Sequence, residues 1–169
     1  MRLELTLPHS VDADFLALPL DSVSSAAIAS AQSLGASHVD VRIERTRTGY
    51  LSLRDAKPET QSDETNFGIG VRVIVNGAWG FASSPDVSID SATKLAHTAV
   101  AMAKTSKPLS TEEIALAPEP VYSKKSWVSA YEIDPFHVSD SEKKDRLASL
   151  SSKLLSSKSV ITQVHIQCM

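Results

Sequence analysis

The sequence predicts an α+β domain, with a mostly antiparallel sheet of about six strands and three helices packed on one face. Two observations support this prediction. Short runs of alternating apolar and polar residues are joined directly by turn signals, which is typical of hairpins rather than of βαβ units. Three other segments carry apolar residues at helical spacing. A chain of 169 residues is long enough to bury a core, and we take residues 1–169 as one domain.

The strongest local signal is a hairpin over residues 68–83. Val71, Val73 and Val75 are separated by single residues, which is strand periodicity. Asn76-Gly77 then predicts a type I′ turn, because both central residues of that turn need φ > 0. The glycines before the strand do not form a phosphate-binding loop, since such a loop must open a helix.

Trp79 and Phe81 fall on one face of the return strand of this hairpin. Aromatic residues that share a strand face are usually part of a core. They could instead anchor an interface, where aromatic residues are enriched. The sequence leaves both interpretations open.

Further strands are expected around the hairpin. The pattern predicts strands over residues 39–44, over residues 51–53 after a turn near Gly49, and near Glu59–Ser62 after a turn at Asp55-Ala56. A last strand is expected over residues 160–168. Residues 1–20 are ambiguous. Alternating leucines there could form a short strand (Leu3, Leu5, Leu7), and Pro8 and Pro19 bracket a loop or a helical turn.

Three helices are expected. The first runs from about Ser22 to Leu34, with Asp21 as candidate N-cap and Gly35 at the C′ position. The second runs from near Ser88 to near Thr105. A stripe of small residues would let it lie close on a sheet (Ala92, Ala96, Ala99, Ala103). The third opens on the capping box of Ser139 and Glu142, runs to about Ser156, and has three leucines on its buried face (Leu147, Leu150, Leu154). Residues 106–133 form a long loop without period.

Composition excludes several function classes. A net charge of −3 provides no electrostatic basis for binding nucleic acid. No apolar run approaches the ~20 residues that a membrane span needs, and the N-terminus does not resemble a signal peptide. The single cysteine, Cys168, cannot form an internal disulfide, so we expect a reducing cytoplasm.

No catalytic or metal-binding motif is present in this chain. The five histidines lack ligand spacing, and no serine lies in a Gly-x-Ser-x-Gly turn. Basic residues gather on or beside two adjacent predicted strands (Arg42, Arg45, Arg47, Arg54), with Asp40 and Glu44 among them. One interpretation is a salt-bridged, exposed sheet face. The other is a groove for a peptide carboxylate or an acidic segment.

Four stretches together carry a family resemblance. They are Gly35–Arg45 (GASHVDVRIER), Leu51–Asp55 (LSLRD), the hairpin over Phe67–Pro85, and Asp134-Pro135-Phe136 with the helix after it. In this order they resemble the N-terminal domain of the TldD/PmbA family, the "modulator of DNA gyrase" family, from about residue 20 onward. The TldD type is more similar than the PmbA type. The chain departs from the family pattern at Ala56 and Pro58, where the family commonly has an Asp-Gly turn without a following proline.

The resemblance implies a zinc-dependent peptidase whose His-Glu-x-x-x-His motif and later cysteine lie beyond the N-terminal domain. This chain has no such motif, so we expect the catalytic part to be absent and the chain to bind no zinc and to be inactive alone. Zinc is implied only for the full-length family member.

The expected role is architectural, in a homo- or heterodimer with a related TldD/PmbA-type subunit and in a channel for unfolded peptide. Candidate interface residues are Trp79, Phe81, Arg42 and Arg54. Two alternatives stay open. The chain could be a stand-alone interaction module, or decoy subunit, that binds a full-length relative, or it could be a truncated gene product without a function. Binding of DNA or gyrase ranks last because of the charge balance.

Overall fold

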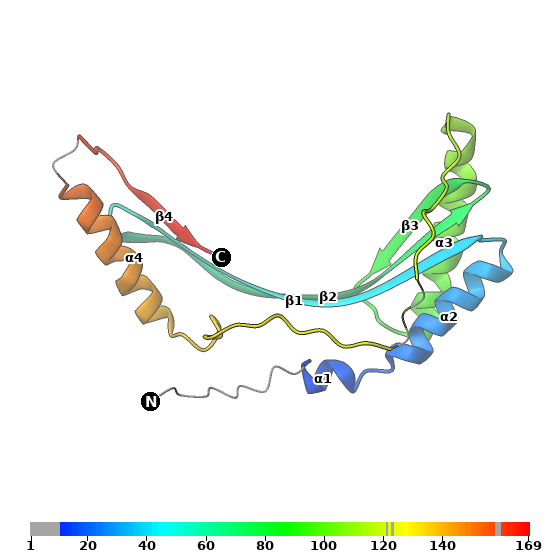
Figure 1. Ribbon diagram of the computed structural model, residues 1–169, viewed down its shortest axis with the longest axis horizontal. Helices are drawn as coiled ribbons and strands as arrows, with labels where there is room; N and C mark the ends of the chain where they lie inside the picture. Colours follow the sequence, from blue (N-terminus) through cyan, green and yellow to red (C-terminus); the bar gives the residue numbers. More distant parts are fainter. Residues whose placement is uncertain (1–10, 121, 123, 158–159) are drawn as a thin grey trace. The chain divides into compact units, whose positions relative to one another are not determined.

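A computed structural model describes residues 11–120, 122, 124–157 and 160–169. Four strands form one sheet in the order β3-β2-β1-β4 (Figure 1). The strands are β1 (His38–Arg54), β2 (Lys57–Val75), β3 (Ala78–Ser84) and β4 (His165–Cys168). The helices are α1 (Ala13–Leu16), α2 (Leu20–Ser33), α3 (Ile89–Ser106), the 3₁₀ turn η1 (Lys107–Leu109) and α4 (Asp140–Leu155). The α+β class and the antiparallel sheet are therefore confirmed.

The predicted numbers of six strands and three helices are wrong. β1 continues through Gly49 without a turn, and β2 includes the strand expected near Glu59–Ser62. Polar cross-strand contacts, such as that between Arg47 and Asp63, sustain both strands where apolar alternation stops. The last strand begins at His165 rather than at residue 160. The strand suggested by Leu3, Leu5 and Leu7 lies outside the described residues.

The described chain divides into two compact units. The α2–α3 unit comprises Ser10–Arg45 and Asn66–Val128. The α4 unit comprises Thr46–Thr65 and Ser129–Met169. Both β1 and β2 therefore contribute residues to each unit.

The core of the α2–α3 unit combines one face of two helices with one face of a strand. α2 and α3 lie side by side, and α3 packs on β3 (Figure 1). The stripe of small residues predicted for α3 is confirmed, because all four alanines are fully buried. The buried core consists of Val23, Ala27 and Ala31 of α2, Ala92, Leu95, Ala96, Ala99, Val100 and Ala103 of α3, and Ile69, Val71, Val73 and Val75 of β2.

Helix ends in this unit follow the predicted chemistry with one exception. Ser88 caps α3 by accepting a hydrogen bond from the N–H of Ser91. Gly35 follows α2 with φ of +96°, as expected for the C′ position. Asp21 is not the N-cap of α2, because the helix begins at Leu20 and Pro19 occupies that position. Asp21 lies in the first turn, where a negative charge interacts favourably with the helix dipole.

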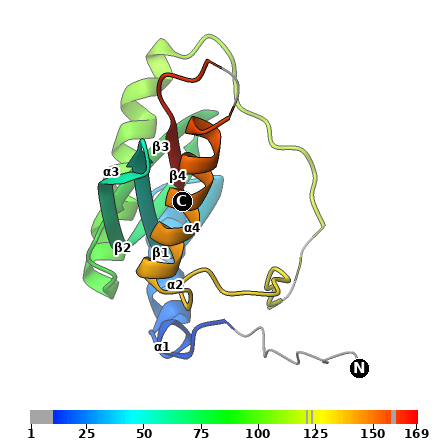
Figure 2. The ribbon, with the colours of Figure 1, turned by 90° about the vertical axis from the view of Figure 1, so that its left-hand side faces the viewer.

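Helix α4 lies beside β4 in the α4 unit (Figure 2). The predicted cap is confirmed, since the Ser139 hydroxyl accepts a hydrogen bond from the N–H of Glu142. The predicted apolar face is wrong: Leu150 and Leu154 are exposed, and Ser151 is the fully buried residue. A polar side chain takes this place because it bonds the backbone of the neighbouring hairpin turn.

The turn between β1 and β2 has two consecutive residues with positive φ, and one of them is an alanine. Asp55 and Ala56 have φ of 49° and 63°, so Ala56 adopts the left-handed conformation that disfavours a Cβ. Three hydrogen bonds hold the turn. The Ala56 N–H donates to Ser151 Oγ, the Asp55 N–H donates to the Val164 carbonyl, and the Val164 N–H donates to the Asp55 carboxylate. These contacts hold Ala56 in its strained conformation.

The long loop after η1 is confirmed as irregular. None of the described residues between Ser110 and Ile133 lies in a helix or strand. One of the alternatives for residues 1–20, a helical turn before Pro19, is present as α1. No helix among the described residues is long and apolar enough to cross a membrane.

Candidate functional site

The β2–β3 turn determines which side chains of the hairpin face away from the core. Asn76 and Gly77 have φ of 51° and 73°, which confirms the predicted type I′ turn. A Cβ at Gly80 would lie 1.9 Å from the carbonyl oxygen of Ala99, so position 80 faces α3 at very short range. Since strand side chains alternate, Trp79 and Phe81 lie on the opposite, outer face of the sheet.

Trp79 is the centre of a small cluster on this outer face, which we call the Trp79 cluster (His38, Asp40, Arg72, Trp79). The guanidinium carbon of Arg72 lies 4.6 Å from the Trp79 ring centroid, a cation–π geometry. The His38 ring approaches Trp79 edge-on, with the centroids 6.4 Å apart. Arg72 also donates from Nε and Nη2 to Asp40 Oδ2, at 2.8 Å and 2.6 Å. Residues from three strands are therefore linked on one surface.

The charges of the Trp79 cluster balance. Partial burial raises the pKa of the Asp40 carboxyl, but hydrogen bonds from Arg72 and His38 lower it further, so the pKa falls below the ordinary value. Asp40 is consequently ionised at neutral pH and neutralises Arg72. The cluster offers a flat aromatic and guanidinium surface rather than a free positive charge.

Phe81 is the most accessible aromatic residue of the hairpin. Its side chain is 52% exposed, and its ring lies over Gly70, where a Cβ would be 3.1 Å from the ring. The core interpretation is therefore wrong for Phe81, and Trp79 is only half-buried on the outer face. The two-residue turn puts Ala78 and Gly80 on the core side instead, where α3 leaves room only for small residues.

Strand β3 is an edge strand of the sheet. Val75 pairs with Ala78 across the tight turn, so the backbone groups of Trp79, Phe81 and Ser83 point away from β2. The Trp79 carbonyl accepts a hydrogen bond from the Ser106 hydroxyl at 3.1 Å. Among the described residues, no partner is recorded for the outward N–H and C=O groups of Phe81 and Ser83. These groups can pair with another extended chain.

The structure assigns each predicted arginine a carboxylate partner. All four lie in one strand, β1, and not in two adjacent strands. Arg42 pairs with Glu44 at 3.3 Å, Arg45 with Asp12, Arg47 with Asp63 at 2.6 Å, and Arg54 with Glu59 at 2.7 Å. Of the candidate interface residues, Arg42, Trp79 and Phe81 belong to the α2–α3 unit and Arg54 to the α4 unit.

Nothing in the described part of the chain resembles a metal centre. No three His, Cys, Asp or Glu side chains gather there in a group that could hold an ion. Three histidines each lie near a single carboxylate. His38 Nε2 is 3.2 Å from Asp40 Oδ2, His165 Nε2 is 3.5 Å from Glu59 Oε2, and His137 Nδ1 is 3.8 Å from Asp134 Oδ2.

A family model and a curated relative each match part of this chain. Residues 39–103 match the family model described as PmbA/TldA metallopeptidase domain 1. The chain is also 37% identical over 79 residues to the metalloprotease MJ0996 of Methanocaldococcus jannaschii. This alignment covers 47% of this chain and 18% of the relative, so the chain spans less than a fifth of that protein.

Two solved structures share the fold. A protein described as a modulator of DNA gyrase, from Bacteroides thetaiotaomicron, superposes with a TM-score of 0.64 at 14% identity, over 87% of this chain and 33% of that one. A protein of the same description from Thermotoga maritima gives a TM-score of 0.54 at 16% identity, over 88% of this chain and 32% of that one. The family-model match over residues 39–103 confirms the predicted resemblance to the N-terminal domain of the TldD/PmbA family, and the two solved structures share the fold of this chain.

Proposed function

We propose that this chain is the non-catalytic first domain of a TldD-type zinc-dependent peptidase, and that it helps to form the peptide channel and the dimer with a related TldD/PmbA-type subunit. The observation that supports this most is the family match over residues 39–103, in a stretch that includes β1, β2, β3 and most of α3. In this proposal zinc would be held by residues outside this chain in the full-length protein, where it would supply the activated water for peptide hydrolysis.

The open edge of β3 is the part of the domain that suits an extended peptide. A peptide that adds to this edge would pair its main chain with the outward groups of Phe81 and Ser83. Main-chain hydrogen bonds do not depend on the peptide's side chains, so such a site accepts many sequences. This tolerance suits a peptidase that acts on unfolded chains.

The outer face beside the edge adds apolar contact. Alternate side chains of an added strand would point to the same side as Phe81 and Trp79, because neighbouring strands keep their faces aligned. Phe81 is the more exposed of the two, and its side chain is 52% exposed. Arg42 lies on the outer face of β1, with its side chain 78% exposed. We propose these three residues as the contact surface and leave Arg54 out, since Glu59 engages it in the other unit.

A proline at the β3 edge tests the peptide proposal. Ser83→Pro removes one outward N–H and places a ring on the free edge, where proline is tolerated in a folded sheet. Binding of β-casein, an extended polypeptide, should become about tenfold weaker, because one hydrogen bond and the close approach of the strand are lost. Fluorescence anisotropy of labelled casein measures this change.

Ser83→Ala is the matched control, because it removes the hydroxyl and keeps the N–H. It should bind casein as the unchanged chain does. Equal binding by the proline variant and the alanine variant would contradict the proposed use of the edge. A circular dichroism spectrum that is the same for all three proteins would show that the sheet is intact.

The metal proposal has its own test. The purified chain should contain no stoichiometric zinc and should leave casein uncut, with and without added zinc. Cleavage that a chelator abolishes would contradict a non-catalytic role. The cytoplasmic location stays a prediction from the single cysteine.

A further inference from the structure

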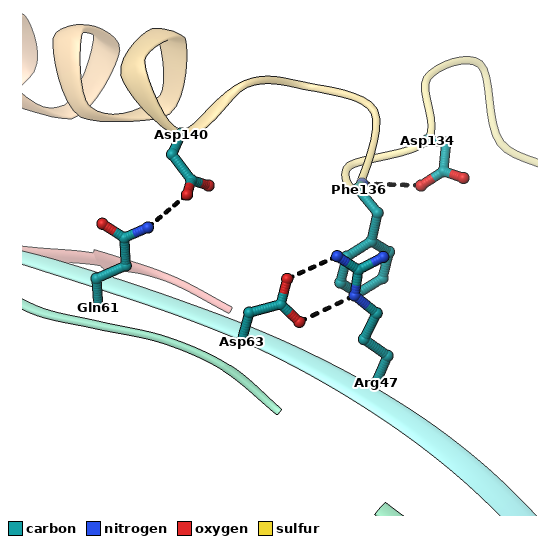
Figure 3. Close-up of polar contacts among 6 residues, drawn as sticks. All are labelled: Arg47, Gln61, Asp63, Asp134, Phe136 and Asp140. Carbon is teal, nitrogen blue, oxygen red and sulfur yellow. Dashed lines mark hydrogen bonds and ion pairs between the residues drawn. The ribbon is translucent and has the colours of Figure 1, made fainter. Parts of the chain in front are cut away.

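A turn before α4 is fixed on the surface of the β1–β2 hairpin by an aromatic contact. In the α4 unit, the Phe136 ring lies against the Arg47 guanidinium, with 4.5 Å between the guanidinium carbon and the ring centroid (Figure 3). A Cβ at Gly49 would be 3.6 Å from the same ring, so the ring also covers the backbone of β1 at that glycine. These contacts lie within one unit and join residues about 90 positions apart in sequence.

An ion pair with Asp63 fixes the orientation of the Arg47 guanidinium. Asp63 of β2 accepts two hydrogen bonds from Arg47, from Nε at 2.9 Å and from Nη2 at 2.6 Å (Figure 3). This bidentate pair raises the pKa of Arg47 and lowers the pKa of Asp63. A planar guanidinium fixed in this way presents a flat face to an aromatic ring at little further entropic cost.

The turn that carries Phe136 is held at both ends. Asp134 Oδ1 accepts the Phe136 N–H at 2.8 Å, and the Asp134 carbonyl accepts the His137 N–H at 3.0 Å. At the other end, the Gln61 side chain donates to the Asp140 carboxylate at the start of α4 (Figure 3). These hydrogen bonds give the turn around Phe136 a defined conformation.

All of these contacts are at the surface. No residue of segment 134–140 is buried, and Phe136 is 39% exposed. Exposed cation–π contacts and ion pairs contribute little free energy each, so the turn can leave the hairpin without unfolding the unit.

We propose that Arg47, Asp63 and Phe136 form a releasable latch that sets the free length of the loop before α4. With the latch closed, the irregular segment ends at Asp134. With the latch open, it extends to Ser139, the N-cap of α4. Within the α4 unit this loop carries an exposed apolar side chain, Ile133 at 71% exposed, so the latch controls how far this residue can move. This inference does not depend on the proposed peptide site.

Hydrogen exchange of the full chain tests the latch through Phe136→Leu. Leucine keeps an apolar side chain but cannot stack on a guanidinium. Exchange of the hydrogen-bonded amides of Phe136 and His137 should become about two- to fivefold faster, which converts to roughly 0.5–1 kcal/mol, the strength of an exposed cation–π contact. Phe136→Trp should restore slow exchange, because tryptophan is the best partner for a cation.

Phe15→Leu is the matched control. The guanidinium carbon of Arg45 lies 5.8 Å from the Phe15 ring centroid, and Arg45 also pairs with Asp12. The α2–α3 unit therefore contains the same combination of a cation–π contact and an ion pair. This variant should leave exchange at Phe136 and His137 unchanged.

A double-mutant cycle with Arg47→Gln, which removes the positive charge, separates a latch from two independent effects. If the ring acts through the guanidinium, Phe136→Leu should add nothing once Arg47 is replaced. Additive effects, or no change at Phe136 and His137, would overturn the proposal. Faster exchange spread over all of α4 and β4 would also overturn it, because the turn would then be an integral part of the unit.

Discussion

The two units of this domain are stabilised in different ways. In the α2–α3 unit, alanines and valines from two helices and a strand form one apolar core. In the α4 unit, few residues are buried, and two of these are serines (Leu51, Ser52, Leu53, Ser151, Val164). Hydrogen bonds from side chains to the hairpin turn and surface ion pairs supply the remaining contacts there.

This difference indicates where the molecule resists change and where it opens. Close packing makes the first unit sensitive to added atoms, because its interior has no room to adjust. The second unit depends on individual polar contacts, each of small free energy, so it should open locally before the first unit unfolds.

Gly80→Ala should be the most destabilising of these changes. The added Cβ would lie 1.9 Å from the Ala99 carbonyl oxygen and 2.7 Å from the Ala103 nitrogen, so α3 must move off β3. We expect a loss of about 3 kcal/mol or more in the free energy of unfolding, measured by urea denaturation. Gly49→Ala is the control, since its nearest contact would be an ordinary 3.6 Å. A Gly80→Ala variant as stable as the Gly49→Ala variant would refute the close approach of α3.

Ser151→Ala should destabilise the α4 unit selectively. It leaves the N–H of Ala56 without its partner, which costs about 1–3 kcal/mol when the group is shielded from water. Hydrogen exchange should accelerate in the β1–β2 turn and α4 but not in α3. Ser149→Ala on the exposed side of the same helix is the control, with no expected effect. Equal acceleration in α3 would contradict the separation into two units.

Ala56→Gly should stabilise the α4 unit. Ala56 has φ of 63°, and relief of that left-handed strain by glycine is worth about 1 kcal/mol. Ala130→Gly, in the irregular loop and without positive φ, should give no such gain. Denaturation curves of the two variants measure the difference. A loss of stability in Ala56→Gly would show that the turn does not hold the alanine under strain.

Acid should weaken the surface ion pairs of both units and leave the apolar core unaffected. Hydrogen bonds from Arg47 and Arg54 lower the pKa values of Asp63 and Glu59 from their ordinary values of 3.8 and 4.5. Their contribution is therefore present above those values and is lost as pH falls through the lower, folded pKa values. The urea midpoint should fall only slightly between about pH 5 and about pH 3, because water and salt screen exposed ion pairs. A stability that rises as pH falls over this range would contradict the assignment.

The two units also differ in how much of their structure the sequence predicts. The helices of the α2–α3 unit and its type I′ turn were predictable, because their apolar residues repeat at a regular period and Asn76-Gly77 has a specific backbone preference. The sequence did not predict that the short strands continue into the long strands β1 and β2. The contact between Arg47 and Asp63 supports that continuation, and no periodic sequence pattern signals it. The buried Ser151 was missed because its partner is a backbone N–H in a distant turn.

The candidate site shows the same limit. Trp79 and Phe81 were predicted to share a face, and they do. Which face they occupy depends on Gly80, whose distance to α3 is a tertiary property. The latch residue Phe136 lies in a stretch that carried the family resemblance, but only the structure shows its contact with Arg47.

The most direct test of the proposed role is an NMR titration of the isotope-labelled chain with β-casein. We expect the amide signals of Phe81 and Ser83 to shift, while those of Gly80 and Ala82, which point to β2, change little. This alternation is specific to strand addition at the β3 edge. Shifts that do not alternate along β3, or that occur only outside β3, would contradict the proposed peptide site.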